Sequence, residues 1–92
     1  MNENQTSNMY LAAALVSYGA EIESVNRDNP RRLMWVFRTV PKFVYLLSDN
    51  EMETRFVVSI DEIKALMASN KMLFMPNFVS SINHVKSYLF AE

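Results

Sequence analysis

The chain has 92 residues, of which 50% are hydrophobic and 21% are charged, and its formal net charge is −1. This composition is typical of a globular protein, and the length suits one domain because a second hydrophobic core would not fit. The near-neutral charge argues against nucleic-acid or membrane binding driven by total charge. No apolar run approaches the roughly 18 residues of a membrane span. The chain has no cysteine, which excludes disulfides and thiolate metal sites.

The N-terminal region predicts a short polar end followed by a helix. Residues 1–6 are expected to be disordered, and residues 7–92 to form a single α+β domain. MNENQTSN lacks the basic region of a secretory signal, so the cytoplasm is the expected location. Ser7 is a suitable N-cap for a helix over residues 8–18. Its apolar stripe has the helical spacing i, i+3, i+4, i+7 and consists of Leu11, Ala14, Leu15 and Tyr18. Gly19, the single glycine, is placed to end this helix in a left-handed conformation.

A first β-hairpin is predicted with strands near residues 21–27 and 32–39. Asp28, Asn29 and Pro30 favour the turn, since Asp and Asn bond nearby backbone amides and proline fixes φ. In the second strand Trp35 and Phe37 share one face with Leu33, and the other face is apolar in the middle and cationic at both ends.

A second hairpin is predicted from two runs rich in β-forming residues, 43–47 and 55–58. The polar segment between them, SDNEMET, is interpreted as the turn. A short helix over residues 41–49 is the alternative, because periodicity does not distinguish a strand from a helix over so short a run.

The C-terminal third predicts two further helices. Ser59 and Glu62 have the spacing of a capping box at the start of a helix near residues 60–69. Residues 72–75 are interpreted as a short strand or an extended entry to the last helix. Pro76 suits the first helical position. The last helix continues to about residue 90 on a stripe of Phe78, Ile82, Val85 and Leu89.

The sequence therefore predicts an α+β fold, a small antiparallel sheet of two hairpins packed with three helices. The order of elements is α-β-β-(β-β)-α-β-α.

Several short motifs resemble a family of small proteins found in phages and other mobile elements and classed as a domain of unknown function. They are G-A-E-I at 19–22, D-N-P-R-R-L-M-W-V-F at 28–37, N-K-M-L-F-M-P-N-F at 70–78 and H-V-K-S-Y-L at 84–89. The resemblance covers about two thirds of the chain, and residues 40–58 look like an insertion relative to the usual pattern. It implies a phage or mobile-element origin and brings no assigned activity with it.

The residues themselves also predict a protein that is not an enzyme and that uses no cofactor or metal. His84 lies off the apolar stripe of its helix and has no partner with ligand or base spacing. Ser80 and Ser81 lack the G-x-S-x-G context of a nucleophile. Acidic pairs such as Asp61 and Glu62 fit a helix N-terminus, which favours negative charge.

A basic cluster interleaved with aromatic residues is the main polar feature of the sequence. It consists of Arg27, Arg31, Arg32, Arg38 and Lys42. With Trp35 and Phe37 among these charges, the cluster predicts a patch for an acidic partner or, as the alternative function, for nucleic acid. The competing interpretation is a solvated turn whose aromatic residues belong to the core. Acidic residues in the segment 49–53 would in that case pair with the arginines within the fold or across a dimer.

The predicted strands carry more apolar residues than one buried sheet face needs. Large exposed apolar patches usually mark partner sites, and methionine suits adaptable contacts. The candidate apolar interface consists of Met34, Val36, Phe43, Tyr45 and Leu47. We therefore expect a small interaction protein that acts by protein–protein binding or as a homo-oligomer, an accessory factor or inhibitor of a host system on the strength of the resemblance. No membrane association is expected.

Overall fold

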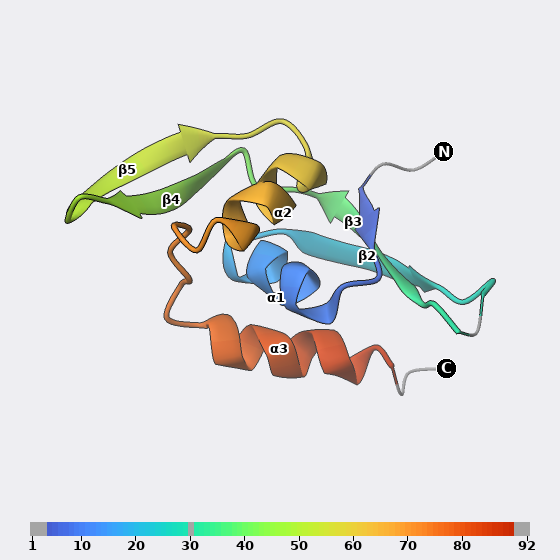
Figure 1. The fold of residues 1–92 in the computed structure, drawn as a ribbon. Helices are drawn as coiled ribbons and strands as arrows, with labels where there is room; N and C mark the ends of the chain where they lie inside the picture. The colour runs from blue at the N-terminus through green and yellow to red at the C-terminus, as the bar shows by residue number, and fades with distance from the viewer. Residues whose placement is uncertain (1–3, 30, 90–92) are drawn as a thin grey trace.

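The computed structural model describes residues 4–29 and 31–89. In these residues, three helices accompany two small antiparallel sheets, so the predicted α+β class is confirmed (Figure 1). The sheets have the strand orders β1-β3-β2 and β4-β5. The elements are β1 (Gln5–Thr6), α1 (Met9–Ser17), β2 (Glu21–Asn26), β3 (Met34–Thr39), β4 (Phe43–Ser48), β5 (Glu51–Phe56), α2 (Ile60–Ala68) and α3 (Phe78–Ser87).

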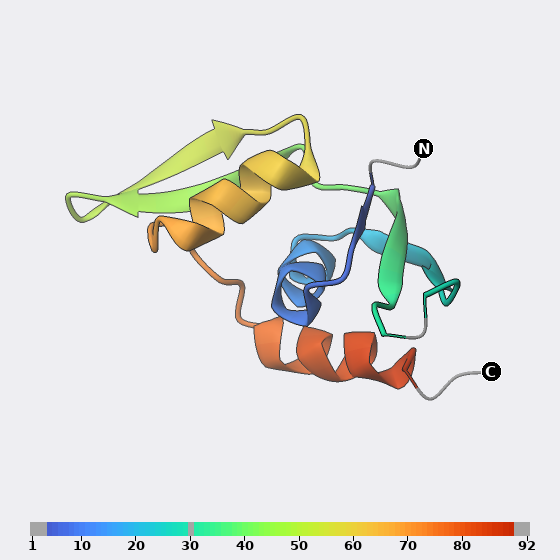
Figure 2. The ribbon, with the colours of Figure 1, turned by 45° about the vertical axis from the view of Figure 1, so that its right-hand side comes forward.

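Helix α1 lies at the centre of the molecule, between α3 and the sheet of β1, β2 and β3 (Figures 1 and 2). Residues 11–15 are all between 0% and 1% exposed. The predicted single apolar stripe is therefore too narrow, because residues 11–15 are buried on every side of the helix. Three of the five residues are alanines, and their small side chains let neighbouring elements approach the helix closely.

The ends of α1 are fixed by local hydrogen bonds. Asn8, rather than the predicted Ser7, is the N-cap, and its side chain accepts bonds from the amides of Tyr10 at 3.0 Å and Leu11 at 3.1 Å. Gly19 has φ +100° and donates to the carbonyl of Val16, while the next amide, that of Ala20, donates to Leu15. These bonds form a Schellman motif, and the role predicted for Gly19 is confirmed.

The first hairpin is confirmed as the antiparallel pair β2–β3. The expected disorder of residues 1–6 is wrong for Gln5 and Thr6, which form β1 against the other edge of β3. Two residues of polar sequence carry too little periodicity to reveal such a strand, which forms because β3 offers unpaired backbone groups there. Residues 1–3 and Pro30, with its predicted turn role, lie outside the described residues.

The second hairpin is also confirmed, and the alternative helix over residues 41–49 is excluded by the antiparallel pair β4–β5. Its turn is shorter than predicted. Ser48 is paired with Glu51, so the turn consists of Asp49 and Asn50, with φ of 51° and 65°. Asp and Asn tolerate positive φ, and two such residues give the tight turn whose twist matches that of the flanking strands.

The two C-terminal helices begin with different caps. Ser59 caps α2 by accepting a bond from the amide of Glu62 at 3.2 Å, as predicted. Glu62 in turn accepts from Val58, one residue before the expected position. Helix α3 begins at Phe78 after the N-cap Asn77, so Pro76 precedes the helix and does not occupy its first position. Between the helices, the predicted strand 72–75 is reduced to one bridge, Met72 to Leu46.

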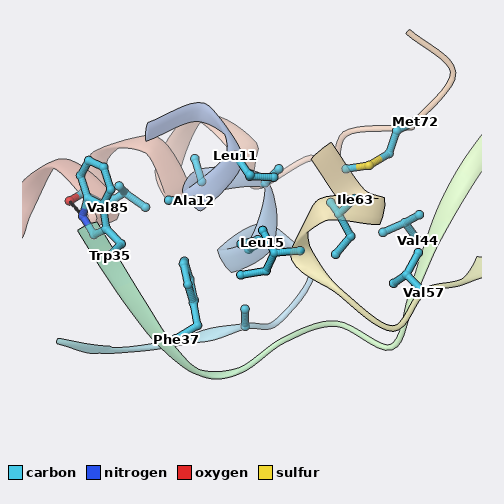
Figure 3. Close-up of a cluster of buried hydrophobic side chains, with 14 of the residues drawn as sticks. Leu11, Ala12, Leu15, Trp35, Phe37, Val44, Val57, Ile63, Met72 and Val85 are labelled. Carbon is cyan, nitrogen blue, oxygen red and sulfur yellow. Dashed lines mark hydrogen bonds between the residues drawn. The ribbon is translucent and has the colours of Figure 1, made fainter. Parts of the chain in front are cut away.

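The buried side chains form a cluster that runs from α3 across α1 to the second hairpin (Figure 3). At one end Trp35 donates its indole N–H to the carbonyl of Val85 at 3.2 Å. At the other end Ile63 of α2 lies against Val44 and Val57. The inner side of the β4–β5 hairpin is thus attached to the core, which determines which of its faces remains outside.

Candidate interaction surface

The β4–β5 hairpin projects from the molecule with its two faces in different surroundings (Figures 1 and 2). Successive side chains of a strand point to opposite faces. On the inner face Val44 and Leu46 are 0% and 5% exposed and belong to the core cluster. Helix α2 lies between this inner face and α1 in both views. The residues of opposite parity therefore lie on the outer face.

The outer face carries large apolar side chains that are directly paired across the two strands. Phe43 is opposite Phe56, and Leu47 is opposite Met52. Their exposed fractions are 40%, 76%, 46% and 65% in that order. We call these four residues the apolar hairpin face. Contiguous exposed apolar groups of this kind are uncommon on monomers and usually mark interaction sites.

Tyr45 lies between the two pairs and ties this face to the body of the molecule. Its ring meets that of Phe43 edge-on, with 5.5 Å between the centroids. Its amide donates to the hydroxyl of Tyr18 at 3.2 Å, and the same hydroxyl donates to the carbonyl of Leu73. Because Leu73 also donates its own amide to Tyr45, the hydroxyl bridges a gap in the pairing of β4 with residues 71–73. Burial raises the pKa of Tyr18 above its ordinary value, which favours the neutral phenol that makes these bonds.

The outer edge of β5 carries backbone groups that no other element of the described structure covers. Tyr45 and Leu47 direct their backbone groups away from β5, toward residues 71–73. Their partners Thr54 and Met52 must therefore direct theirs away from β4, because directly opposite residues of an antiparallel pair bond either to each other or outward. In both views the outer side of β5 is open (Figures 1 and 2).

Glu53 and Arg55 lie on the inner-face parity of β5, where they form an ion pair of 3.2 Å. Their side chains are 52% and 50% exposed, so solvent screens the pair and its contribution to stability is small. Glu53 thus pairs with Arg55 of its own strand and not, as predicted for the acidic segment, with the basic cluster. A hollow between Arg55 and α2 is lined by Glu62, Ala65 and Leu66.

The basic cluster does not form one patch. Arg31 and Arg32 lie at the β2–β3 turn, whereas Arg38 and Lys42 lie beyond most of β3. Six residues of extended chain between Arg32 and Arg38 span roughly 20 Å. The cluster also takes part in the fold, since Arg27 donates to the carbonyl of Tyr88 and Arg32 donates to the Ser7 hydroxyl at 3.2 Å.

The aromatic residues of the basic stretch are buried. Trp35 and Phe37 are 4% and 2% exposed. A base cannot stack on a ring that the core already covers, so the stacking half of the nucleic-acid interpretation is wrong. The competing interpretation, in which Trp35 and Phe37 belong to the core, is confirmed for these two residues.

The predicted apolar interface separates into two groups. Val36 is buried at 8% and Met34 is half-buried, because β1 and β2 flank β3 on both edges. Phe43, Tyr45 and Leu47 do share the outer face of the hairpin. Sequence reasoning missed Met52 and Phe56 as members of that face, although the alternation of E-M-E-T-R-F contains the signal of a strand.

The residues weighed for catalysis have local structural roles. The hydroxyls of Ser80 and Ser81 donate to the carbonyl of Asn77 in the first turn of α3, at 2.9 and 2.8 Å. His84 is exposed and meets the ring of Tyr88 edge-on, with 5.4 Å between centroids. Within residues 4–29 and 31–89, no three His, Cys, Asp or Glu side chains gather as a metal site would require.

No helix in the described part of the chain has the length and apolarity that crossing a bilayer requires. The fold thus defines a small α+β domain that presents an apolar hairpin. Comparison of the chain with protein-family models, curated proteins and solved structures found no match.

Proposed function

We propose that this protein is a small non-enzymatic interaction protein that binds another protein molecule through the β4–β5 hairpin, and that this molecule is a second copy of the same chain. The observation that carries the proposal is the apolar hairpin face next to an uncovered strand edge. Phe56 and Met52 are 76% and 65% exposed, and burying such side chains stabilises a contact by about 1.5–3 kcal/mol each.

Closed twofold pairing is the commonest way in which a protein buries such a surface against itself. The resemblance to proteins of phages and mobile elements extends the proposal to an accessory factor or an inhibitor of a host system, acting in the cytoplasm. Nucleic-acid binding is the weaker alternative, because the aromatic residues it would use are buried and the basic residues lie in separate groups.

The test is the mass of the protein in solution, measured by light scattering and sedimentation over a range of concentrations. We expect the wild type to reach twice the 10.7 kDa of the single chain. The double variant Met52→Ser with Phe56→Ser should remain at 10.7 kDa. Val79→Ser is the matched control, since Val79 is 70% exposed on α3, away from the hairpin. A wild type that is monomeric throughout, or an equal loss in the control, would contradict the proposal.

A further inference from the structure

The sequence of β5 is complementary to itself when it is read against a second, antiparallel copy. Around Thr54, the flanking residues are Glu53 on one side and Arg55 on the other, then Met52 and Phe56. An antiparallel pair centred on Thr54 therefore places Glu53 of each copy opposite Arg55 of the other. It also places Met52 of each copy opposite Phe56 of the other. Opposite charges and apolar pairs in these positions stabilise a sheet.

We propose that two copies associate edge to edge through β5, with Thr54 on the twofold axis, and form one continuous sheet of order β4-β5-β5-β4. This inference rests on the proposed function, because it specifies how the second copy binds the hairpin. Charged residues on an edge strand ordinarily prevent pairing with other strands. In β5 the negative Glu53 and the positive Arg55 lie two residues apart. These charges disfavour pairing with most other strands, but they match each other in one register with an identical strand.

The backbone of β5 supports this register independently. Thr54 directs its amide and carbonyl to the open edge, as Met52 does, and Phe56 has the same parity. In the proposed pair Thr54 faces Thr54, and Met52 faces Phe56 twice. In each of these facing pairs, the backbone amide and carbonyl groups of both residues therefore point at the other strand. A regular antiparallel ladder requires this arrangement.

Neighbouring registers are less favourable. A pair centred on Glu53 places two glutamates directly opposite each other, and a pair centred on Arg55 does the same with two arginines. Like charges in directly opposite positions destabilise a sheet. Shifting one strand by a single residue places the apolar side chains of the two copies on opposite faces. The register centred on Thr54 avoids all three.

The twofold axis in this arrangement stands perpendicular to the sheet, so the apolar hairpin faces of both copies lie on one side. Along the seam, Met52 of each copy packs beside Phe56 of the other, so these pairs bury part of the apolar surface that the proposed function assigns to the contact. Phe43 and Leu47 of both copies extend the same side into one platform. Helix α2 of each copy lies on the opposite side, over the inner face. The pairing leaves the attachment of the hairpin to the core unchanged.

The first experiment exchanges charges and measures association by sedimentation. In a dimer of Glu53→Arg, the substituted arginine of each copy lies opposite Arg55 of the other copy. In a dimer of Arg55→Glu, the substituted glutamate of each copy lies opposite Glu53 of the other copy. Each variant alone should associate about tenfold more weakly or worse than the wild type. Mixing the two variants in equal amounts restores opposite charges at both positions, so the mixture should form a heterodimer. Glu51→Arg is the matched control, because Glu51 faces Val57 in this register and carries no ion pair.

The second experiment uses the absence of cysteine from the chain to read the register directly. Thr54→Cys places two thiols across the twofold axis, where facing Cα atoms of a hydrogen-bonded pair lie about 5.5 Å apart, within disulfide range. This variant should become a disulfide-linked dimer under mild oxidation. Met52→Cys should not, since the two substituted positions would lie about 13 Å apart, four residues along the strand.

The outcomes separate this inference from the proposed function. Association that persists in both charge variants, a mixture that does not recover, or cross-linking at Met52→Cys in place of Thr54→Cys would overturn edge pairing. If the double variant Met52→Ser with Phe56→Ser is monomeric at the same time, self-association through the hairpin still stands. A monomeric wild type overturns both. Circular dichroism of each variant verifies that a loss of association does not reflect unfolding.

Discussion

Helix α1 and strand β5 are opposite extremes of burial in one small fold. Residues 11–15 of α1 are at most 1% exposed, whereas all six residues of β5 are exposed. Both segments contain apolar side chains, but α1 is enclosed by α3 and by the sheet of β1, β2 and β3, and β5 has β4 alone as an extensive neighbour among the described elements. The comparison teaches that an apolar residue stabilises a fold only where other elements cover it. The apolar residues of β5 remain available to a partner.

The sharpest way to break this comparison is to truncate one large side chain in each region. Leu15→Ala should lower the free energy of unfolding by about 2–5 kcal/mol, because Leu15 is 0% exposed and its loss leaves a cavity. Phe56→Ala should change it by less than about 0.5 kcal/mol in the monomer, as surface substitutions usually do. Denaturant unfolding at low protein concentration measures both values. Equal costs for the two variants would show that β5 is part of the core.

A second test concerns the Tyr18 hydroxyl, which joins the C-terminal end of α1 to β4, the partner strand of β5. Tyr18→Phe leaves the Tyr45 amide and the Leu73 carbonyl without their bridge and should cost about 1–3 kcal/mol at neutral pH. Tyr10→Phe is the matched control, since Tyr10 is 58% exposed and should change little. Thermal melts report both variants, and a cost that is the same in both would exclude the bridging role.

The pKa of Tyr18 gives the same bridge a pH dependence. Burial raises its folded pKa above the ordinary tyrosine value of 10.0, so the unfolded chain loses this proton first as the pH rises. The stabilisation by Tyr18 is fully present below pH 10.0 and is lost as the pH increases through the folded pKa. The stability difference between the wild type and Tyr18→Phe should therefore narrow in alkaline buffer. A constant difference across that range would contradict the assignment.

The smallest expected effect sharpens the comparison within the hairpin. Asn50 has φ 65°, a conformation that glycine adopts without a steric penalty. Asn50→Gly should stabilise the hairpin by less than about 1 kcal/mol, and Asn50→Val should destabilise it. Hydrogen exchange of the β4 amides measures the local change. Protection in α1 should stay the same in both variants, and a parallel change there would show that the two regions unfold together.

The sequence predicted the fold well where side-chain periodicity and caps coincide. Gly19, Ser59 and the aromatic residues of β3 carry strong local signals, and their roles are confirmed. Strand β1 was missed because Gln5 and Thr6 are polar and form a strand only through pairing with β3. The start of α3 was misplaced because Pro76 also fits the extended residues that precede a helix.

The candidate surface was predicted in part, and the reason is geometric. Alternation in residues 43–47 placed Phe43, Tyr45 and Leu47 on one face, which the structure reproduces. Val36 satisfied the same pattern, yet a strand with partners on both edges buries even its outward residues. The segment SDNEMET is mostly polar and was interpreted as a turn throughout. The turn itself consists of only Asp49 and Asn50, so β5 begins within this segment. Whether a strand side chain is buried depends on which strands lie beside its own. The local sequence pattern does not determine this, because those strands are distant in the chain.

The position of α1 in the chain also has a consequence for how the protein is made. Helix α1 occupies residues 9–17, yet α3, which covers one of its sides, begins at residue 78. A ribosome adding roughly 5–20 residues per second needs about 3–12 seconds to synthesise the interval between them. During this time the apolar side chains of α1 have no α3 to pack against. The native core can therefore close only after α3 has been synthesised, and a nascent chain stalled before α3 would be a target for chaperones and proteases.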